Sequence, residues 1–238
     1  MAGEIELQVG GGPMRALLEK PRGAGPFPGV VVCFHMGGLD EFSHWLVEDL
    51  ARQGFAAIAP DHYHWLPPGF PISRRREILT DQGLAMDLAV SRGYLECLDE
   101  VDGDRLGILG HCMGGRTTLL GVGVDKRYKA GCIWYGGSAF KPLGEGPSPV
   151  DRIPNIAAKV MGFFGNEDQN PSPDDVNRID AAMTAAGIEH EFHRYDKTGH
   201  GFMNQFGGEK YVESSAKDSW ARASAFLKQT LGVKATAS

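Results

Sequence analysis

The sequence GHCMGG at residues 110–115 places a cysteine between glycines where two predicted elements meet. The apolar run at residues 106–109 predicts a buried strand before it, and residues 113–120 suit a helix after it. This is the nucleophile-elbow pattern, with Cys112 in place of the usual serine. The turn leaves no room for side chains at the flanking positions, and the thiol then lies at a helix N-terminus whose dipole favours a thiolate. The alternative is a buried core cysteine beside an ordinary glycine-rich turn.

Strands and helices alternate on both sides of the elbow. Residues 29–34 form a continuous apolar run, which is typical of a strand buried on both faces of a parallel sheet. Residues 4–9 and 14–19 flank a glycine-rich turn and predict an N-terminal hairpin. The pattern predicts an α/β fold with a mostly parallel central sheet flanked by helices on both faces. Further strands are expected at residues 55–59, 129–135, 159–164 and 189–195, and helices at residues 41–52, 73–100 (with Ser73 as N-cap), 172–186 and 209–231.

Composition narrows the class of protein. The chain has 238 residues and a formal net charge of −6, with 42% hydrophobic and 23% charged residues. These values exclude intrinsic disorder, and the acidic balance argues against nucleic-acid binding. We expect a single domain over residues 1–238, with residues 232–238 as a flexible tail.

The sequence lacks the patterns that are typical of membrane, secreted and metal-binding proteins. No run approaches the roughly 18 apolar residues of a membrane span, and the start carries no basic segment typical of a secretory signal. The four cysteines lack the spacing of a zinc site or a disulfide framework. We therefore expect a cytoplasmic protein with reduced thiols, without membrane contact and without a bound metal.

Two further candidates for catalysis follow predicted strands, at the edge where the ligand sites of parallel sheets lie. Asp168 comes in the loop after residues 159–164, and His200 stands between glycines in the loop after residues 189–195. The chain order of nucleophile, acid and histidine is that of the α/β-hydrolase arrangement. An imidazole is needed to move the proton of the thiol, and a carboxylate orients and supports the imidazole. Glu167 is the alternative to Asp168 as the acid.

An oxyanion hole requires two backbone N–H groups near the nucleophile. One belongs to the residue after the cysteine, Met113. The other is expected in the HMGG loop at residues 35–38, whose glycines let the backbone bend toward the site, and Met36 is the predicted donor.

Taken together, the chain from residue 28 to about residue 231 resembles the dienelactone hydrolase family of α/β-hydrolases. The resemblance implies the α/β-hydrolase fold and a Cys-Asp-His triad that opens an ester or enol-lactone through an acyl-enzyme, without metal or organic cofactor. It is carried by FHMGG at residues 34–38, PDHY at residues 60–63, GHCMGG at residues 110–115, the Asp168 loop and GHGF at residues 199–202.

The sequence departs from the family pattern at two substrate-facing positions. The best-known members carry a glutamate where His35 stands, and that glutamate influences the protonation of the cysteine. They also carry an arginine that holds a substrate carboxylate where this chain has Asn204. A second carboxylate-binding arginine corresponds to one of residues 74–76, with Arg76 as the choice, although a solvated helix start is the plainer interpretation of this run. The residues expected to line the substrate site are His35, Arg76, Trp134, Phe202 and Asn204.

An imidazole at position 35 changes the electrostatics beside the nucleophile. A glutamate there would repel a thiolate, whereas a neutral imidazole would not and a protonated one would favour it. The hypothesis is therefore that Cys112 is more constitutively reactive than in glutamate-bearing relatives. The alternative is that His35 points away and only packs.

These observations favour a cysteine-dependent hydrolase of small esters or (enol-)lactones, with a small-molecule ester or lactone as its partner. The alternatives are a promiscuous carboxylesterase or thioesterase that does not act on dienelactones, and a non-catalytic binding protein of the same fold. The physiological substrate, its pathway, any partner protein and the choice between monomer and dimer stay open at this point.

Overall fold

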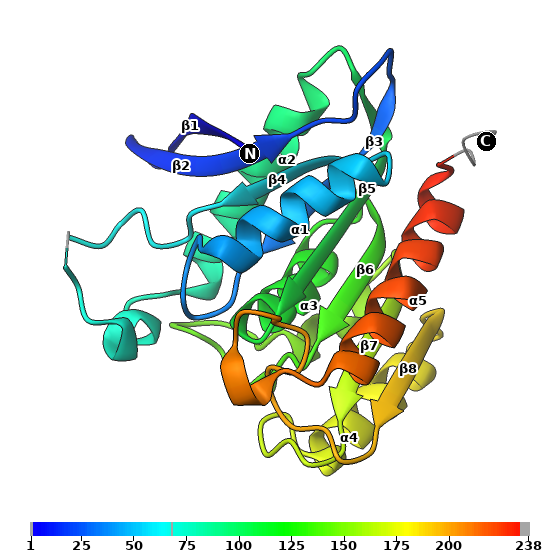
Figure 1. Ribbon diagram of the computed structural model, residues 1–238. Coiled ribbons are helices and arrows are strands. Elements are labelled where there is room, and N and C mark those ends of the chain that lie inside the picture. The colour runs from blue at the N-terminus through cyan, green and yellow to red at the C-terminus, as the bar shows by residue number, and fades with distance from the viewer. Residues whose placement is uncertain (1, 68, 234–238) are drawn as a thin grey trace.

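Eight strands form one sheet in the computed structural model, which describes residues 2–67 and 69–233 (Figure 1). Their order across the sheet is β1-β2-β4-β3-β5-β6-β7-β8. β1 and β2 form an antiparallel hairpin that joins β4 antiparallel, and all later neighbours are parallel. The predicted hairpin and the mostly parallel sheet are thus confirmed. The strands are β1 (Gly3–Val9), β2 (Gly12–Glu19), β3 (Phe27–Cys33), β4 (Ala56–Pro60), β5 (Val101–His111), β6 (Tyr128–Trp134), β7 (Lys159–Gly165) and β8 (His190–Tyr195).

Helices cover both faces of the sheet, as the sequence predicts. α1 (Glu41–Arg52) and α5 (Glu213–Leu231) pack on one face, where Leu46 and Leu227 are fully buried. α2 (Asp81–Glu96), α3 (Met113–Val124) and α4 (Pro173–Ala185) cover the other. Three short 3₁₀ helices lie in the connections, at Ile72–Glu77, Val150–Asn155 and Gly208–Lys210.

The helix predicted at residues 73–100 with Ser73 as N-cap is wrong at its start. The 3₁₀ helix Ile72–Glu77 occupies this segment, and α2 begins only at Asp81. Thr80 is the N-cap, because its side chain accepts a hydrogen bond from the N–H of Gly83 at 3.0 Å. This cap separates a segment that carries three arginines from the helix that packs on the sheet.

Other boundaries move by a few residues. β5 begins at Val101, earlier than predicted, because its start pairs with Phe27 of β3. The last helix begins at Glu213 instead of residue 209, after a 3₁₀ turn in which Gly208 has a φ of +63°. Gly232 ends α5 in the left-handed region, and residues 234–238 of the expected tail lie outside the described residues. Within residues 2–67 and 69–233, no helix combines the length and apolar character that crossing a membrane requires.

Candidate active site

The nucleophile elbow is formed where β5 meets α3. Cys112 has a φ of +57° and a ψ of −116°, a region that costs a non-glycine residue about 1–3 kcal/mol unless the surroundings enforce it. A Cβ at Gly110 would clash with the carbonyl of Gly114, and a Cβ at Gly114 would clash with the carbonyl of Cys33. Glycine at both positions therefore lets the chain turn sharply enough to bring the half-buried thiol to the carboxyl edge of the sheet.

The structure joins Cys112, His200 and Asp168 by hydrogen bonds. Nδ1 of His200 lies 2.7 Å from Oδ2 of Asp168. The Asp168 side chain is buried, and its Oδ1 accepts a hydrogen bond from the N–H of Asn170 at 2.8 Å. The same imidazole hydrogen-bonds the Cys112 thiol. Glu167, the alternative acid, has an exposed side chain, so Asp168 is the carboxylate that meets the imidazole.

These contacts favour a thiolate beside an imidazolium. Burial raises the pKa of the Cys112 thiol, but the hydrogen bond with His200 and the backbone N–H groups of Met113 and Met36 outweigh it and lower this pKa below its usual value. Burial likewise opposes the charged form of His200, yet its bonds with Asp168 and Cys112 raise its pKa to about 10. Both shifts favour the charged pair, a Cys112 thiolate beside a His200 imidazolium, over the neutral pair.

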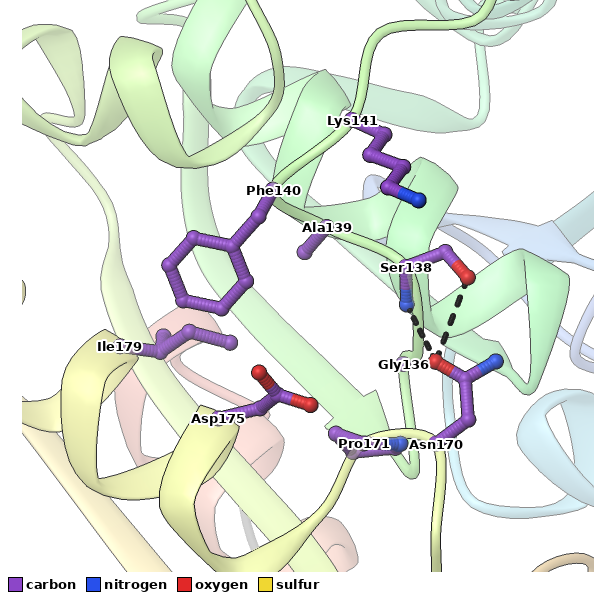
Figure 2. Close-up of a pocket in the computed structure, with 9 residues that line it drawn as sticks. All are labelled: Gly136, Ser138, Ala139, Phe140, Lys141, Asn170, Pro171, Asp175 and Ile179. Carbon is purple, nitrogen blue, oxygen red and sulfur yellow. Dashed lines mark hydrogen bonds between the residues drawn. The ribbon is translucent and has the colours of Figure 1, made fainter.

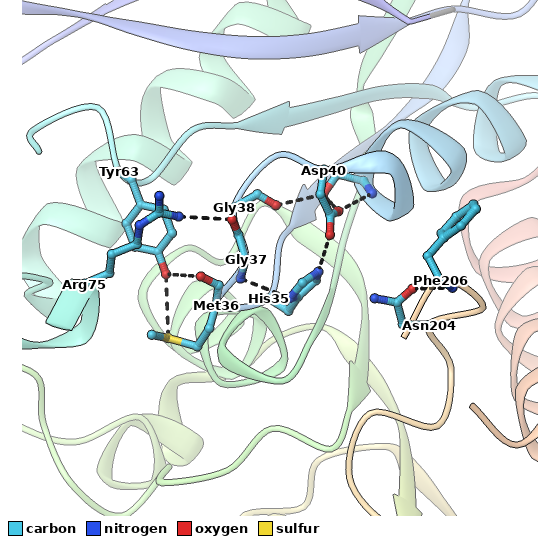
Figure 3. A network of polar contacts seen from close by, with 10 residues as sticks. His35, Met36, Gly37, Gly38, Asp40, Tyr63, Arg75, Asn204 and Phe206 are labelled. Atoms are coloured by element: carbon cyan, nitrogen blue, oxygen red, sulfur yellow. Dashed lines mark hydrogen bonds and ion pairs between the residues drawn. The ribbon is translucent and has the colours of Figure 1, made fainter. Parts of the chain in front are cut away.

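Hydrogen bonds to neighbouring groups hold the loop at residues 35–38 in place (Figure 3). The carbonyl of His35 accepts the N–H of Gly38 at 3.0 Å. The carbonyl of Met36 accepts a hydrogen bond from the Tyr63 hydroxyl at 3.2 Å. The carbonyl of Gly37 accepts one from Nη1 of Arg75 at 3.0 Å. The backbone N–H groups of Met36 and Met113 both interact with the Cys112 sulfur. Both predicted oxyanion donors thus lie beside the thiol.

His35 itself contacts groups other than the thiol. Its Nδ1 accepts the N–H of Gly37 at 3.1 Å, so Nε2 carries the proton and donates to Asp40 at 2.7 Å. Asp40 in turn caps α1, because it accepts the N–H of Ser43. Both ring nitrogens are engaged, so the structure gives no hydrogen bond between His35 and Cys112, and the imidazole instead fastens the loop to α1.

Arg76 is the one of the three adjacent arginines that reaches the thiol pocket. Arg74 pairs with Glu77 on the surface, and Arg75 binds the loop at residues 35–38. Arg76 lines a pocket of about 60 Å³ at the thiol and makes no hydrogen bond or ion pair with any residue that the structure describes. The other lining residues are Met36, Cys112, Met113, Arg116, Gly137, Asn170 and His200.

The remaining predicted substrate residues lie outside this lining. Trp134 is fully buried on the α5 side of the sheet, where its Nε1 donates to Ser219 at 3.1 Å. Phe202 is fully buried against the ring of Tyr135. Asn204 accepts the N–H of Phe206 at 2.9 Å and stabilises its own loop (Figure 3). Trp134 ends a strand and the other two residues follow the histidine, and such positions do not decide which way a side chain points.

Sequence reasoning missed Arg116, Gly137 and Asn170 in the pocket. Asn170 follows Asp168 by two residues, and Arg116 lies one helical turn after Cys112, so their spacing to the triad was the available signal. Arg116 is buried and paired with Asp81 through two hydrogen bonds of 2.6 and 3.1 Å. Arg116 therefore holds α3 against the start of α2.

Residues 14–231 match the family model described as "Dienelactone hydrolase family". A putative carboxymethylenebutenolidase of Escherichia coli O157:H7 is 31% identical to the chain, over 98% of the chain and 89% of the relative. Another, of Methylorubrum extorquens, is 29% identical over 96% of the chain and 81% of the relative. The crystal structure of a putative dienelactone hydrolase from Klebsiella pneumoniae superposes with a TM-score of 0.88 at 29% identity, covering 98% of this chain and 99% of that one. The fold is the α/β-hydrolase fold.

Proposed function

The chain belongs to the dienelactone hydrolase family, and we propose that it is a cysteine-dependent hydrolase of small esters or enol-lactones. Membership places it among hydrolases that act on ester or lactone bonds. The observation that carries the cysteine mechanism is the hydrogen-bonded series Cys112, His200 and Asp168 at the elbow, with two backbone N–H groups beside the sulfur. The cytoplasm stays the location that the sequence predicts.

The arrangement supports a two-step acyl transfer. The Cys112 thiolate attacks the carbonyl carbon, and the N–H groups of Met36 and Met113 hold the oxygen that becomes negative. As the C–O bond breaks, the His200 imidazolium gives its proton to the leaving alkoxide or enolate, and a thioester forms on Cys112. Neutral His200 then takes a proton from water, the hydroxide attacks the thioester, and the thiolate leaves with its imidazolium partner restored. Asp168 keeps the imidazole oriented through both steps.

Arg76 extends this proposal to the substrate. Its guanidinium lines the thiol pocket without a partner among the described residues, and an arginine binds a carboxylate through two parallel hydrogen bonds. We assign it the carboxylate of an acidic ester or lactone. This favours dienelactone-like substrates over neutral linear esters, even though Asn204 replaces the second arginine of the family pattern.

Iodoacetamide tests the cysteine mechanism against the non-catalytic alternative. The protein should hydrolyse p-nitrophenyl acetate, and alkylation near pH 7 should abolish this activity in step with modification of Cys112, because that thiol has the lowered pKa. Cys97 is the exposed thiol, whereas Cys33 and Cys132 are buried. The variant Cys97→Ser should lose activity at the same rate. Absence of ester and lactone hydrolysis across a panel would refute the proposal.

Tyr63 and Arg75 offer a test of the oxyanion assignment. The Tyr63 hydroxyl stays protonated, since burial raises its pKa, and it donates to the carbonyl of Met36, while Arg75 lies over its ring at 4.7 Å. Tyr63→Phe removes this bond and the weaker contacts of the hydroxyl with the Met36 and Met113 sulfurs at 3.6 and 3.5 Å, and it keeps the ring. We expect kcat to fall about tenfold with little change in KM, because the Met36 N–H loses its fixed direction where charge develops.

The control for Tyr63→Phe is Arg74→Gln, because Arg74 lies on the same segment as Arg75 but pairs with exposed Glu77 and lies over the Phe70 ring. It should leave kcat unchanged. A rise in KM at constant kcat in Tyr63→Phe would assign the hydroxyl to substrate binding and contradict the oxyanion role.

A further inference from the structure

The pocket at the thiol is too small to hold a whole ester substrate. Its volume is about 60 Å³, whereas small-molecule sites usually enclose ~300–1,000 Å³ and bury most of the ligand. It has room for the reacting carboxyl group and the Arg76 contact. The rest of the molecule, either the acyl group or the alcohol group, has to lie elsewhere.

A second cavity, of about 190 Å³, is drawn in Figure 2, and its lining shares a residue with that of the thiol pocket. Asn170 lines both cavities. Gly136 lines the larger one, and the next residue, Gly137, lines the smaller one. A Cβ at Gly137 would clash with the backbone carbonyl of Asn170, so glycine lets the segment after β6 pass this close to the loop of the catalytic acid. The two hollows are neighbours along one wall.

That wall is fixed from two sides. Oδ1 of Asn170 accepts both the N–H and the hydroxyl of Ser138, at 2.8 and 3.2 Å (Figure 2). Arg116, which is buried on α3, donates hydrogen bonds to the carbonyls of Ser138 and Lys141, at 3.3 and 2.6 Å. Ser138 has a φ of +56°, which these contacts enforce. The cavity is therefore preformed, and its wall is tied to the elements that carry Cys112 and Asp168.

The cavity has a polar side, which includes the exposed Lys141, and an apolar side that suits a hydrocarbon group. Ala139, Phe140 and Ile179 supply hydrocarbon surface, and Figure 2 shows the Phe140 ring standing over the Ile179 side chain. The Asp175 carboxylate is already used, because it accepts the N–H and hydroxyl of Ser172 at 3.1 and 3.0 Å. Its charge also pairs with Arg178 at 3.6 Å. An apolar ligand group would leave no buried polar partner unsatisfied here.

We propose that this cavity is a specificity subsite that binds the apolar acyl or alcohol group of the ester while its carbonyl lies at Cys112. The inference rests on the proposed hydrolase function and adds the chemical class of substrate. Beside the carboxylate that we assign to Arg76, it adds a preference for a medium-sized hydrocarbon group on one side of the ester bond. The size of residues 139 and 140 sets the limit of that group.

Two variants change the cavity in opposite directions. Ala139→Leu narrows it, and Phe140→Ala widens it. Phe226→Ala is the matched control, because Phe226 is also partly buried but lies on α5 at the other face of the sheet. Values of kcat/KM are measured for p-nitrophenyl acetate, butyrate and hexanoate, and for methyl, butyl and hexyl esters of one acid. The first series varies the acyl group, and the second varies the alcohol.

In one of the two series, Ala139→Leu should lower kcat/KM for the longest ester about tenfold relative to the shortest, and Phe140→Ala should move the preference to longer groups. The series that responds identifies the bound side of the substrate. Phe226→Ala should leave both profiles unchanged. If Ala139→Leu does not fold, Phe140→Ala alone decides.

Unchanged chain-length profiles in both series, with p-nitrophenyl acetate still hydrolysed and Cys112 still alkylated at the wild-type rate, would overturn the subsite and leave the proposed function standing. A wild-type protein that hydrolyses none of the esters, in contrast, would refute the proposed function itself and the subsite with it.

Discussion

Replacing Cys112 with alanine is expected to lower kcat/KM for an activated ester by about 10⁴-fold or more while the protein stays folded. The sulfur supplies the nucleophile, and no other described thiol can take its place. Cys33 packs against the elbow but is fully buried, and burial raises its pKa, while Cys132 is also buried and Cys97 is exposed at the end of α2. Alanine has the same φ preferences as cysteine, so the strained turn with a φ of +57° is no harder to form. Turnover of p-nitrophenyl acetate and thermal unfolding are the two measurements.

Cys97→Ala is the matched control, because it removes an exposed thiol without touching the site. It should retain full activity. Comparable turnover in Cys112→Ala and the wild type would contradict the mechanism, and a melting temperature far below that of the wild type would mean that the thiol also serves the fold.

His200→Ala should lower kcat/KM by about 10³- to 10⁴-fold and also raise the pKa of the remaining thiol. In the wild type the thiol pKa is lowered, so the thiolate persists as the pH falls below the usual thiol range, and the imidazolium persists until its own pKa of about 10. Without His200, burial is the main influence left on Cys112, and burial favours the neutral thiol. The rate of iodoacetamide alkylation near pH 7 should fall, with its midpoint displaced to higher pH.

Asp168→Asn and Glu167→Gln separate the two candidate acids in the same assay. Asp168→Asn should cost about 10²- to 10⁴-fold in kcat/KM, because the buried carboxylate that meets Nδ1 of His200 is lost. Glu167→Gln changes an exposed side chain and should be silent. The reverse result would reassign the acid, and an unchanged alkylation profile in His200→Ala would remove the imidazole from the activation of the thiol.

The sheet and the elbow are predictable because each rests on a local pattern. Continuous apolar runs bounded by glycine and proline locate the parallel strands, and the glycines around Cys112 are required by close contacts that any such turn makes. The meeting of Cys112, His200 and Asp168 follows from a topological rule, that the loops after parallel strands share one edge. The break before α2 could not be predicted from the local sequence. The N-cap at Thr80 depends on the tertiary contact between Asp81, the first residue of α2, and Arg116.

The direction of side chains could not be predicted in this way. His35 stands in the right loop, but its two nitrogens bind Asp40 and Gly37. Trp134 ends a strand at the active edge, yet its ring lies in the core on the α5 side. Asn170 serves the site through its contacts with Ser138, which lies far from it in sequence. Each outcome depends on non-local packing, which periodicity and motifs do not record.

The most direct test of the mechanism is to locate the acyl group. The protein is mixed with excess p-nitrophenyl butyrate, quenched in acid within the first turnovers, digested and mapped by mass spectrometry. We predict a butyryl thioester on the peptide that contains Cys112, absent after prior alkylation with iodoacetamide and absent from the peptide that contains Cys97. A burst of p-nitrophenol with Cys112 unmodified, or with the butyryl group on another residue, would contradict the account.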